Sequence, residues 1–261
     1  MRTFKLTLAY DGTEYVGWQR QKNGRSIQNE LERVCSEIEG GPVTISGAGR
    51  TDAGVHALGQ VASFRLAHDI APASLVRALN AKLPTDIRVL DIEQTDDHFH
   101  ARFCAKRKTY RYYLAPGPVA SPFTRMHAWH VYESLDLAAM RVAGHTLEGT
   151  HDFSAFQAVG TEISSTIRTM YHVGVTEVEY VPAVTLPRQR PLVEVNVVGD
   201  GFLRHMVRIM VGTLFSVGTR QCPPESISDT IASRLRERAG ITAPAHGLFL
   251  ISVDYEYSRG S

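Results

Sequence analysis

Apolar and polar residues in the first hundred positions alternate with the periods expected of a β-α-β-β-α-β unit. A period of two predicts a strand, and apolar residues three or four positions apart predict a helix. Strands are predicted at residues 3–10, 43–46, 60–66 and 87–92, and helices at residues 26–39 and 72–83. Ser26 can cap the first helix and Gly40 can end it, while Pro84 stops the second. This order of elements is that of the split βαβ, or ferredoxin-like, fold.

The second half of the chain can be assigned the same order of elements, with insertions. Strands are predicted at residues 108–114, 126–132, 170–181, 192–198 and 248–255, and helices at residues 134–147, 202–217 and 224–239. Ser134 is the expected cap of the first of these helices, and a polar loop at residues 186–191 joins two of the strands. We therefore predict an α+β protein of two ferredoxin-like (RRM-like) halves, with an N-terminal domain at residues 1–105 and a C-terminal domain at residues 106–261. Two such halves could pair their sheets and leave a cleft between them.

The length and composition are those of a globular protein. The 261 residues suffice for one large or two modest domains, and 43% hydrophobic with 21% charged residues excludes disorder over most of the chain. No apolar run reaches the roughly 18 residues of a membrane span, and the N-terminus lacks the apolar block of a signal peptide. Cys35, Cys104 and Cys222 lie far apart and form no CxxC pair, which argues against a disulfide framework or a structural zinc site. We therefore expect a cytoplasmic protein with no membrane association.

Positive charge is concentrated locally, although the net charge is only +1. Residues 98–132 contain no Asp or Glu, and aromatic residues are interleaved with basic ones along this stretch. The basic residues are Arg102, Lys106, Arg107, Lys108, Arg111 and Arg125. Positive side chains bind phosphates and aromatic faces stack on bases, so this texture is typical of an RNA-binding surface. The alternative is a pair of strands with a solvated basic face, and composition alone does not separate the two.

The densest motif is GAGRTDAGVH at residues 47–56. It is not a P-loop, because Val55 and His56 stand where that motif needs Lys and Ser/Thr, and Asp52 stands where a dinucleotide fingerprint needs its third glycine. What remains is one carboxylate, Asp52, between small residues and near Arg50. Glycines let a backbone turn sharply and let a bulky ligand approach. The motif is therefore either a functional carboxylate loop or a tight loop whose Asp caps its own backbone.

Arg208 is the second candidate for chemistry. The predicted helix at residues 202–217 is apolar nearly all round, which indicates that it is buried. A buried guanidinium is costly unless it meets a carboxylate. One interpretation of Arg208 is a structural ion pair within the C-terminal domain. The other is that Arg208 reaches the cleft and holds Asp52 ionised, as an oriented nucleophile or base.

Metal chemistry has weaker support in the sequence. His98, His100 and Cys104 form an HxHxxxC cluster, but a metal site usually needs three or four ligands with supporting partners. The sequence has no GxSxG elbow and no HExxH motif. The carboxylate pair Asp96–Asp97 lies in a polar loop and is interpreted as solvated surface. We therefore expect no metal site.

Six motifs, in the order of the chain, resemble the tRNA pseudouridine synthase A (TruA) family along essentially its whole length. The most specific is GAGRTDAGVHALGQVASF at residues 47–64, which resembles the catalytic motif of that family. The others are YDGTEYVGWQRQ (10–21), HARFCAKRKTYRYYL (100–114), THDFSAF (150–156), GFLRHMVRIMVGTL (201–214) and TAPAHGLFLISVDYEY (242–257). The chain departs from the family pattern at Ile209 and Met210, where Asn-Ile is usual. This departure is expected to affect the packing of the helix more than the catalytic chemistry.

The resemblance implies a fold, a reaction and an assembly. The fold would be two ferredoxin-like halves with a continuous, mostly antiparallel sheet, helices on one face and a central catalytic cleft. The reaction would be the isomerisation of uridines at positions 38, 39 and 40 of the tRNA anticodon stem-loop to pseudouridine, carried out by a homodimer. No redox change occurs and no group is added from outside, so no cofactor is expected.

The resemblance also implies roles for particular residues. Asp52 falls on the catalytic nucleophile, Tyr110 on the tyrosine that stacks on the target base, and Arg208 on the arginine paired with the aspartate. Arg50 falls on the arginine thought to enter the space left by the flipped nucleotide. The expected substrate-binding residues are Arg50, His56, Arg102, Lys106, Lys108 and Tyr110.

Two functions of other classes stay open from the residues alone. A non-catalytic RNA-binding module with RRM-like halves would share the fold, but the RRM signature with its Gly-Phe-Gly-Phe run is absent, and Asp52 and Arg208 would have no role in it. A metal-dependent nuclease or deaminase would need a ligand set that the motifs do not supply. Treatment with a chelator would separate this last class from the others.

Overall fold

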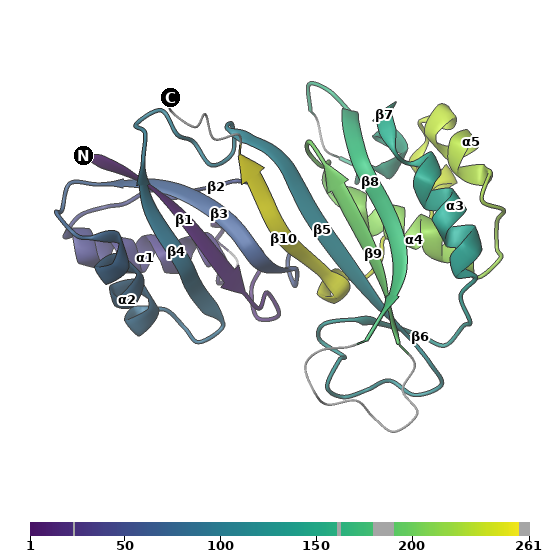
Figure 1. The fold of residues 1–261 in the computed structure, drawn as a ribbon, viewed down its shortest axis with the longest axis horizontal. Coiled ribbons are helices and arrows are strands. Elements are labelled where there is room, and N and C mark those ends of the chain that lie inside the picture. Colours follow the sequence, from purple (N-terminus) through teal and green to yellow (C-terminus); the bar gives the residue numbers. More distant parts are fainter. Residues whose placement is uncertain (23, 161–162, 180–190, 256–261) are drawn as a thin grey trace. The chain divides into compact units, whose positions relative to one another are not determined.

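The computed structural model describes residues 1–22, 24–160, 163–179 and 191–255 (Figure 1). The chain forms two compact units, one made of Met1–Lys108 with Phe249–Ser261 and the other of Thr109–Leu248. No helix in the described part of the chain is both long enough and apolar enough to cross a membrane. The predicted polar loop at residues 186–191 lies almost entirely outside the described residues.

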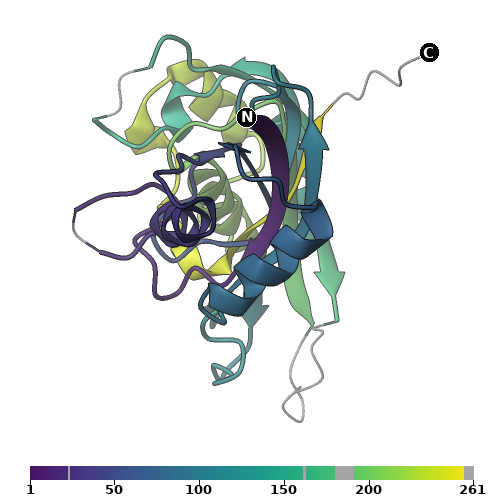
Figure 2. The same ribbon diagram turned by 90° about the vertical axis from the view of Figure 1, so that its left-hand side faces the viewer.

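The first unit has the ferredoxin-like order of elements and strands. Its elements are β1 (Arg2–Tyr10), α1 (Ile27–Glu39), β2 (Ser46–Gly47), β3 (His56–Leu66), α2 (Pro72–Lys82) and β4 (Ile87–Thr95), joined by most of β10 (Leu248–Tyr255). The strands lie in the order β4-β1-β3, with β2 on the other side of β3, and these pairs are all antiparallel. Helices α1 and α2 pack against each other beside these strands (Figure 2). The fold predicted for this half is confirmed.

The alternating apolar residues of β1 form the centre of this unit's core. Phe4, Leu6 and Leu8 are fully buried, and Phe4 stacks on Phe64 of β3 with ring centroids 5.7 Å apart. Burying each such side chain contributes roughly 1.5–3 kcal/mol. Helix α1 begins after Ser26, whose side chain accepts a hydrogen bond as predicted for its N-cap.

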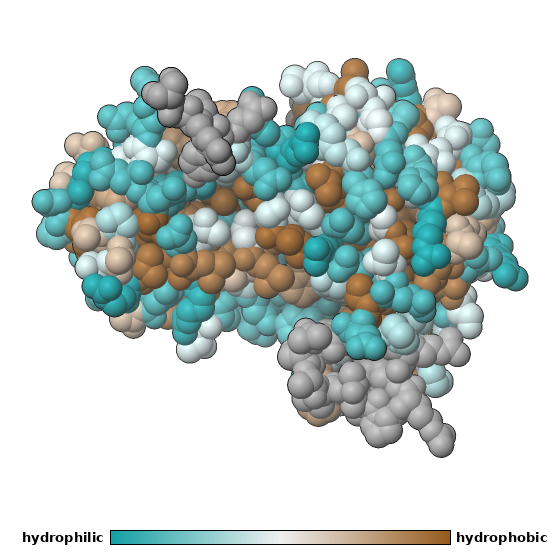
Figure 3. All heavy atoms as spheres, viewed as in Figure 1, coloured by the Kyte–Doolittle hydropathy of each residue, from teal (hydrophilic) through white to brown (hydrophobic). Residues whose placement is uncertain are grey.

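Some apolar side chains of this unit reach its surface. Leu58 of β3 and Leu90 of β4 are each 53% exposed. On the face seen in Figure 3, apolar residues lie among hydrophilic ones over the strands of this unit. Single exposed leucines are ordinary on protein surfaces and identify no site by themselves.

The outer edge of β3 is shared by two short pairings. β2 pairs antiparallel with Ala62 and Ser63, near the C-terminal end of β3. β10 pairs parallel with His56 and Ala57, at the start of β3. The chain therefore leaves β2 and returns to the first residue of β3 through residues 48–55. This short return carries the centre of the GAGRTDAGVH motif.

The second unit contains a four-strand sheet with helices that follow its strands in the chain. Its elements are the C-terminal part of β5 (Ala105–Pro116), β6 (Trp129–Val131), α3 (Leu137–Thr146), β7 (Gly149–Asp152), β8 (Ile167–Val178), β9 (Leu192–Gly199), α4 (Met206–Gly218) and α5 (Ser226–Ser233), with 3₁₀ turns at Ser154–Phe156, Arg236–Arg238 and Ala245–Gly247. The strands lie in the order β5-β9-β8-β7, and β6 pairs in parallel with β5. α3 packs on both β8 and α4. The predicted α+β class is confirmed.

Helix boundaries in the second unit differ from the predicted ones. α3 is capped by Asp136 rather than by Ser134, because the Asp136 carboxylate accepts the first-turn N–H of Ala139. α4 begins only after His205, whose left-handed backbone (φ 61°) interrupts the predicted helix. The helix predicted at residues 224–239 ends at another left-handed residue, Arg234 (φ 59°). Single residues of positive φ are not visible in apolar periodicity.

Candidate active site

Asp52 lies outside regular secondary structure, in the return loop of residues 48–55 between β2 and β3, which is called the Asp52 loop below. Its side chain is half-buried, Thr51 before it is buried, and Arg50 is exposed. The Asp52 carbonyl accepts a hydrogen bond from Val55 N at 3.2 Å, so the chain turns directly after this residue. The loop therefore presents a carboxylate and a guanidinium on either side of a buried threonine.

A second loop, at residues 11–18, holds the backbone around Asp52. Trp18 N donates a hydrogen bond to Thr51 O at 3.1 Å. Gly17 has φ +104°, and a Cβ at this residue would lie 2.5 Å from Thr51 O and 3.0 Å from the Asp52 carbonyl carbon. Only glycine allows two backbones to approach this closely. The two loops are therefore fitted together along their main chains.

The start of α1 supports this second loop in turn. Ile27 N donates to Gly17 O at 3.2 Å, and Gln28 N donates to Trp18 O at 3.0 Å. The first N–H groups of a helix have no partner within the helix, so these loop carbonyls satisfy them. The support of the Asp52 backbone thus extends through the second loop to a helix.

His56, the first residue of β3, contacts the start of the same loop. Its Nδ1 accepts a hydrogen bond from Gly12 N at 3.1 Å and lies 3.1 Å from Asp11 Oδ1. Its ring stacks on Phe249 of β10, with ring centroids 4.6 Å apart. The side chain is only 1% exposed, so these contacts tie the second loop and β10 to β3. A contact of His56 with substrate stays a prediction.

The predicted basic residues of the first unit lie in two environments. Lys108 lies beside the Asp52 loop, since a Cβ built on Gly49 would be 3.3 Å from Lys108 Nζ. Arg102 and Lys106 are exposed. The Arg102 guanidinium lies over the ring of Phe103 at 5.8 Å, and Phe103 is itself 76% exposed. Basic and aromatic groups thus occur together on this surface, as the interleaved sequence predicts.

The HxHxxxC spacing forms a local turn in the structure. Cys104 N donates to His100 O at 3.0 Å, and His100 N lies 3.4 Å from Cys104 Sγ. His100 Nδ1 accepts a hydrogen bond from Arg102 N at 3.1 Å. Within the described residues, His98, His100 and Cys104 do not bring three ligand atoms close enough to share one ion.

Tyr110 lies on β5 in the second unit and is 7% exposed. Its ring meets the edge of Phe202, with ring centroids 5.1 Å apart and an interplanar angle of 84°. Phe202 belongs to the segment that leads into α4. Edge-to-face pairs have a preferred geometry, so this contact orients the tyrosine ring.

Arg208 is a half-buried residue in a helix that is otherwise almost entirely buried. Every other residue of α4 except Ser216 is buried, which confirms the predicted burial of this helix. Arg208 Nε donates to Ala243 O at 2.7 Å, and Ala243 N donates to Arg208 O at 3.1 Å. Burial raises the pKa of Tyr112 on β5, and the Arg208 charge offsets part of that rise. The guanidinium is therefore held at Nε and acts electrostatically on its surroundings.

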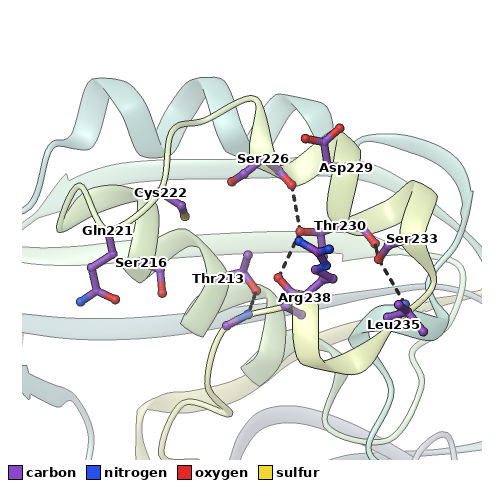
Figure 4. Close-up of a pocket in the computed structure, with 12 residues that line it drawn as sticks. Thr213, Ser216, Gln221, Cys222, Ser226, Asp229, Thr230, Ser233, Leu235 and Arg238 are labelled. Carbon is purple, nitrogen blue, oxygen red and sulfur yellow. Dashed lines mark hydrogen bonds between the residues drawn. The ribbon is translucent and has the colours of Figure 1, made fainter.

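A cavity of about 690 Å³ in the second unit lies beside α4 and α5 (Figure 4). It is lined by Thr213, Ser216, Gln221, Cys222, Ser226, Asp229, Thr230, Ser233, Leu235, Arg238, Ala239 and Gly240. The Thr213 hydroxyl donates to Ile209 O, and the Thr230 hydroxyl donates to Ser226 O, each at 2.8 Å. The same two hydroxyl groups also join the segment after α5, because Thr213 Oγ1 accepts from Gly240 N and Thr230 Oγ1 donates to Arg238 O. No predicted site residue lines the cavity.

Known proteins are similar in sequence to this chain over nearly its full length. A family model described as tRNA pseudouridine synthase matches residues 7–104 and 143–256. A tRNA pseudouridine synthase A of Syntrophotalea carbinolica is 44% identical over 255 residues, covering 98% of this chain and 97% of the relative. The chain belongs to the tRNA pseudouridine synthase family. Relatives of the same name from Acetivibrio thermocellus (43% over 255 residues, 98% of this chain and 100% of theirs) and an Exiguobacterium species (44% over 256 residues, 98% and 99%) agree.

Membership in the tRNA pseudouridine synthase family confirms the predicted enzyme class. The chain is an isomerase that converts uridine to pseudouridine in tRNA. The alternative of a non-catalytic RNA-binding module is therefore wrong.

Sequence reasoning did not identify the residues that hold the Asp52 loop. Gly17 and Trp18 lie in YDGTEYVGWQRQ, which carried the family resemblance but gave no contact. Their hydrogen bonds and close approach join positions more than thirty residues apart, and spacing along the chain does not encode such pairs.

Proposed function

We propose that this synthase modifies uridines 38, 39 and 40 of the tRNA anticodon stem-loop, with Asp52 as the nucleophile and Tyr110 and Arg208 as its catalytic partners. The observation that carries the proposal is the Asp52 loop. A half-buried carboxylate stands at a turn whose backbone is fixed by a second loop, and Arg50 and Lys108 bring positive charge to the same loop. A nucleophile fixed before substrate arrives loses less freedom in the reaction.

The reaction balances without any group from outside the substrate. The bond between ribose C1′ and uracil N1 breaks, the base turns, and C1′ bonds to C5. The C5 proton leaves, and N1 takes up a proton. The Asp52 carboxylate can attack C1′, assist formation of a glycal, or add to C6 of the base. Each route needs an ionised carboxylate that reaches one face of an extruded nucleotide.

Tyr110 is assigned to the extruded base. Its ring is oriented by Phe202, and an aromatic ring in a fixed orientation can stack on a base. Its hydroxyl is the group proposed to assist removal of the C5 proton.

Arg208 is assigned as the ion-pair partner of Asp52. Its Nε is held by Ala243 O, and the fork of a guanidinium offers further donors that match a carboxylate. This pairing would keep Asp52 ionised and oriented for attack.

Backbone phosphates of the tRNA are assigned to the exposed basic residues. Arg102, Lys106 and Arg50 are exposed, and Lys108 lies beside the Asp52 loop. Phosphate contacts of this kind make binding weaker as salt rises. The family resemblance further supports a homodimer, which sedimentation of the purified protein would test.

The decisive experiment measures tritium release from tRNA that carries 5-tritiated uridine. Asp52→Asn keeps the shape of the side chain but removes the carboxylate, so release should fall to background while tRNA binding stays within about an order of magnitude. Position-specific mapping of pseudouridine in the same tRNA tests sites 38, 39 and 40. Turnover by the Asn variant comparable to wild type would overturn the assignment of Asp52.

A further inference from the structure

Within the first unit, we infer that Tyr10 and Gln60 are positioning residues that fix the Asp52 loop through Thr51 and Gly49. The inference rests on the proposed role of Asp52. Tyr10 is the last residue of β1 and Gln60 lies within β3, so both side chains come from the sheet. They act on the loop from its buried side, whereas the second loop acts on its main chain.

The hydrogen bonds run from the sheet to two loop positions. The Tyr10 hydroxyl lies 2.8 Å from Thr51 Oγ1. Gln60 Nε2 donates to Gly49 O at 3.1 Å and to the Tyr10 oxygen at 3.4 Å. One glutamine amide thus holds the loop directly and also holds the tyrosine that meets Thr51.

The contacts of Gln60 use both of its amide hydrogens. Its two amide hydrogens go to Gly49 O and to Tyr10, and its Oε1 accepts a hydrogen bond from Val61 N at 3.1 Å. The side chain is fully buried, so losing either donor would leave a buried polar group without its partner. Because Gln60 donates to the Tyr10 oxygen, the simplest arrangement has Tyr10 donate its own proton to Thr51.

Tyr10 is suited to act as a neutral donor. It is 4% exposed, and its burial raises its pKa to about 12, with its hydrogen bonds to the side chains of Thr51 and Gln60 offsetting part of that rise. The phenol therefore keeps its proton throughout the range in which the enzyme would be assayed. A fixed donor at this position holds Thr51 in one orientation.

The anchored positions alternate with the positions assigned to chemistry. Gly49 and Thr51 are held from the buried side, while Arg50 is exposed and Asp52 is half-buried. Anchoring Thr51 therefore fixes the backbone on both sides of Arg50 and directly before Asp52. A displacement of about 1 Å in a reacting group can cost a hundredfold in rate. Loosening these anchors should lower the rate without removing any group that touches the substrate.

Tyr255 supplies a control for Tyr10. It belongs to β10 in the same unit, and its hydroxyl donates at 2.7 Å to Ala101 O, a residue of neither the Asp52 loop nor the loop at residues 11–18. Tyr10→Phe and Tyr255→Phe each remove one hydroxyl that is hydrogen-bonded within the unit. Both should lower the melting temperature, and only Tyr10→Phe should change the chemical step.

The test measures single-turnover tritium release, KM and tRNA affinity for each variant below its melting temperature. Tyr10→Phe should lower kcat at least tenfold, with KM and tRNA affinity changed less than threefold, and Tyr255→Phe should leave kcat within twofold of wild type. Thr51→Val should reproduce the Tyr10→Phe defect, whereas Thr51→Ser keeps the hydroxyl and should restore most of the rate. The double variant Tyr10→Phe with Thr51→Val should have nearly the same kcat as either single variant, because both substitutions remove the same hydrogen bond.

Gln60→Glu tests the second anchor with a side chain of the same size, because a carboxylate cannot donate to Gly49 O or to Tyr10. A similar fall in kcat at unchanged KM is expected. Wild-type kcat in both Tyr10→Phe and Thr51→Val would overturn the inference, as would an equal fall in Tyr255→Phe. Asp52→Asn is assayed in parallel. Turnover in that variant refutes the proposed function, whereas an inactive Asp52→Asn with a fully active Tyr10→Phe refutes only the positioning role.

Discussion

The return loop at residues 48–55 and helix α4 each carry one residue assigned to catalysis, Asp52 and Arg208, but they hold it by different means. Asp52 lies outside regular structure, and its loop is fixed by hydrogen bonds from a second loop and from the sheet of its unit. Arg208 lies in a regular helix, where the 3.6-residue period places it, and its Nε donates a hydrogen bond to Ala243 O. The conformation of the loop is fixed by contacts with other segments, whereas the conformation of the helix is fixed by its own backbone hydrogen bonds.

This difference predicts how each region responds to substitution. A helix keeps its path when one side chain is changed, because its backbone bonds are internal to it. A loop without such bonds depends on the partners that hold it. Substitutions in α4 should therefore act through the changed side chain, and substitutions around the loop should also act through its backbone.

The largest effect in this comparison is expected for Arg208→Met. The substitution keeps much of the side-chain volume and the helix, but it removes the proposed partner of Asp52. Breaking a buried pair typically costs about 3–5 kcal/mol, and because Arg208 is only half-buried we expect about half of this, roughly 2 kcal/mol, which is a fall in single-turnover rate of about thirtyfold. Arg208→Lys should rescue the rate only in part, since lysine lacks the two-pronged match to a carboxylate.

Arg236→Met is the matched control for this prediction. The Arg236 guanidinium donates to Ala239 O and Gly240 O, so it too binds carbonyls in the second unit, but it has no proposed role in catalysis. The control should lose stability and keep the wild-type rate. A folded Arg208→Met enzyme with wild-type rate would show that Arg208 is structural and would leave Asp52 without its proposed activator.

A smaller fall is expected for Tyr110→Phe, assayed by single-turnover tritium release and by tRNA binding. The stacking face and its contact with Phe202 survive, so binding should change little. The rate should fall by roughly tenfold, less than the hundredfold or more that follows removal of a full general base, because the hydroxyl is proposed only to assist proton transfer. Tyr113→Phe, on the same strand but outside the proposed centre, should keep the wild-type rate. Full activity of Tyr110→Phe would reduce the role of Tyr110 to stacking.

Substitutions at Gly17, which packs against the return loop, and at Gly212 of α4 allow the stability of the two regions to be compared. A Cβ at Gly17 would lie 2.5 Å from Thr51 O, and a Cβ at Gly212 in α4 would lie 1.8 Å from Ile241 O. Alanine at either position should destabilise the fold by about 1–3 kcal/mol through overpacking, measured by urea denaturation. Gly41→Ala, where the added Cβ meets nothing within 4 Å, should stay within about 0.5 kcal/mol of wild type.

Gly17→Ala and Gly212→Ala should differ in their effect on kcat. Gly17→Ala should also lower kcat at temperatures where the protein is folded, because the backbone of Thr51 and Asp52 must shift. Gly212→Ala should lower stability with a smaller effect on kcat, since the helix can keep its path. Equal kcat losses for equal losses of stability would contradict the distinction between the two regions.

No effect is expected from removal of metal ions, once the folding of the tRNA is controlled for. The proposed chemistry uses the carboxylate of Asp52, the phenol of Tyr110 and the guanidinium of Arg208, and it requires no added group. Tritium release should therefore persist in excess EDTA. A loss that zinc restores would return attention to His98, His100 and Cys104.

Much of the fold followed from periodicity in the sequence. The spans of β10 and α2 agree with prediction to within a residue, and Ser26 caps α1 as expected. Repeating apolar positions report directly on which face of a strand or helix is buried. The breaks at His205 and Arg234 were not predicted, because a single left-handed residue leaves that pattern intact.

The elements, the family and the identity of the candidate chemical groups all follow from the sequence. Asp52 stood out as the one carboxylate of a glycine-rich motif, and Arg208 as a charge within an apolar helix. The contacts that hold Asp52 in place became visible only in the folded chain. Tyr10, Gln60 and Gly17 meet the loop across gaps of 11 to 41 residues, through hydrogen bonds and backbone contacts. Such contacts depend on how separate segments pack, and no local pattern in the chain records them.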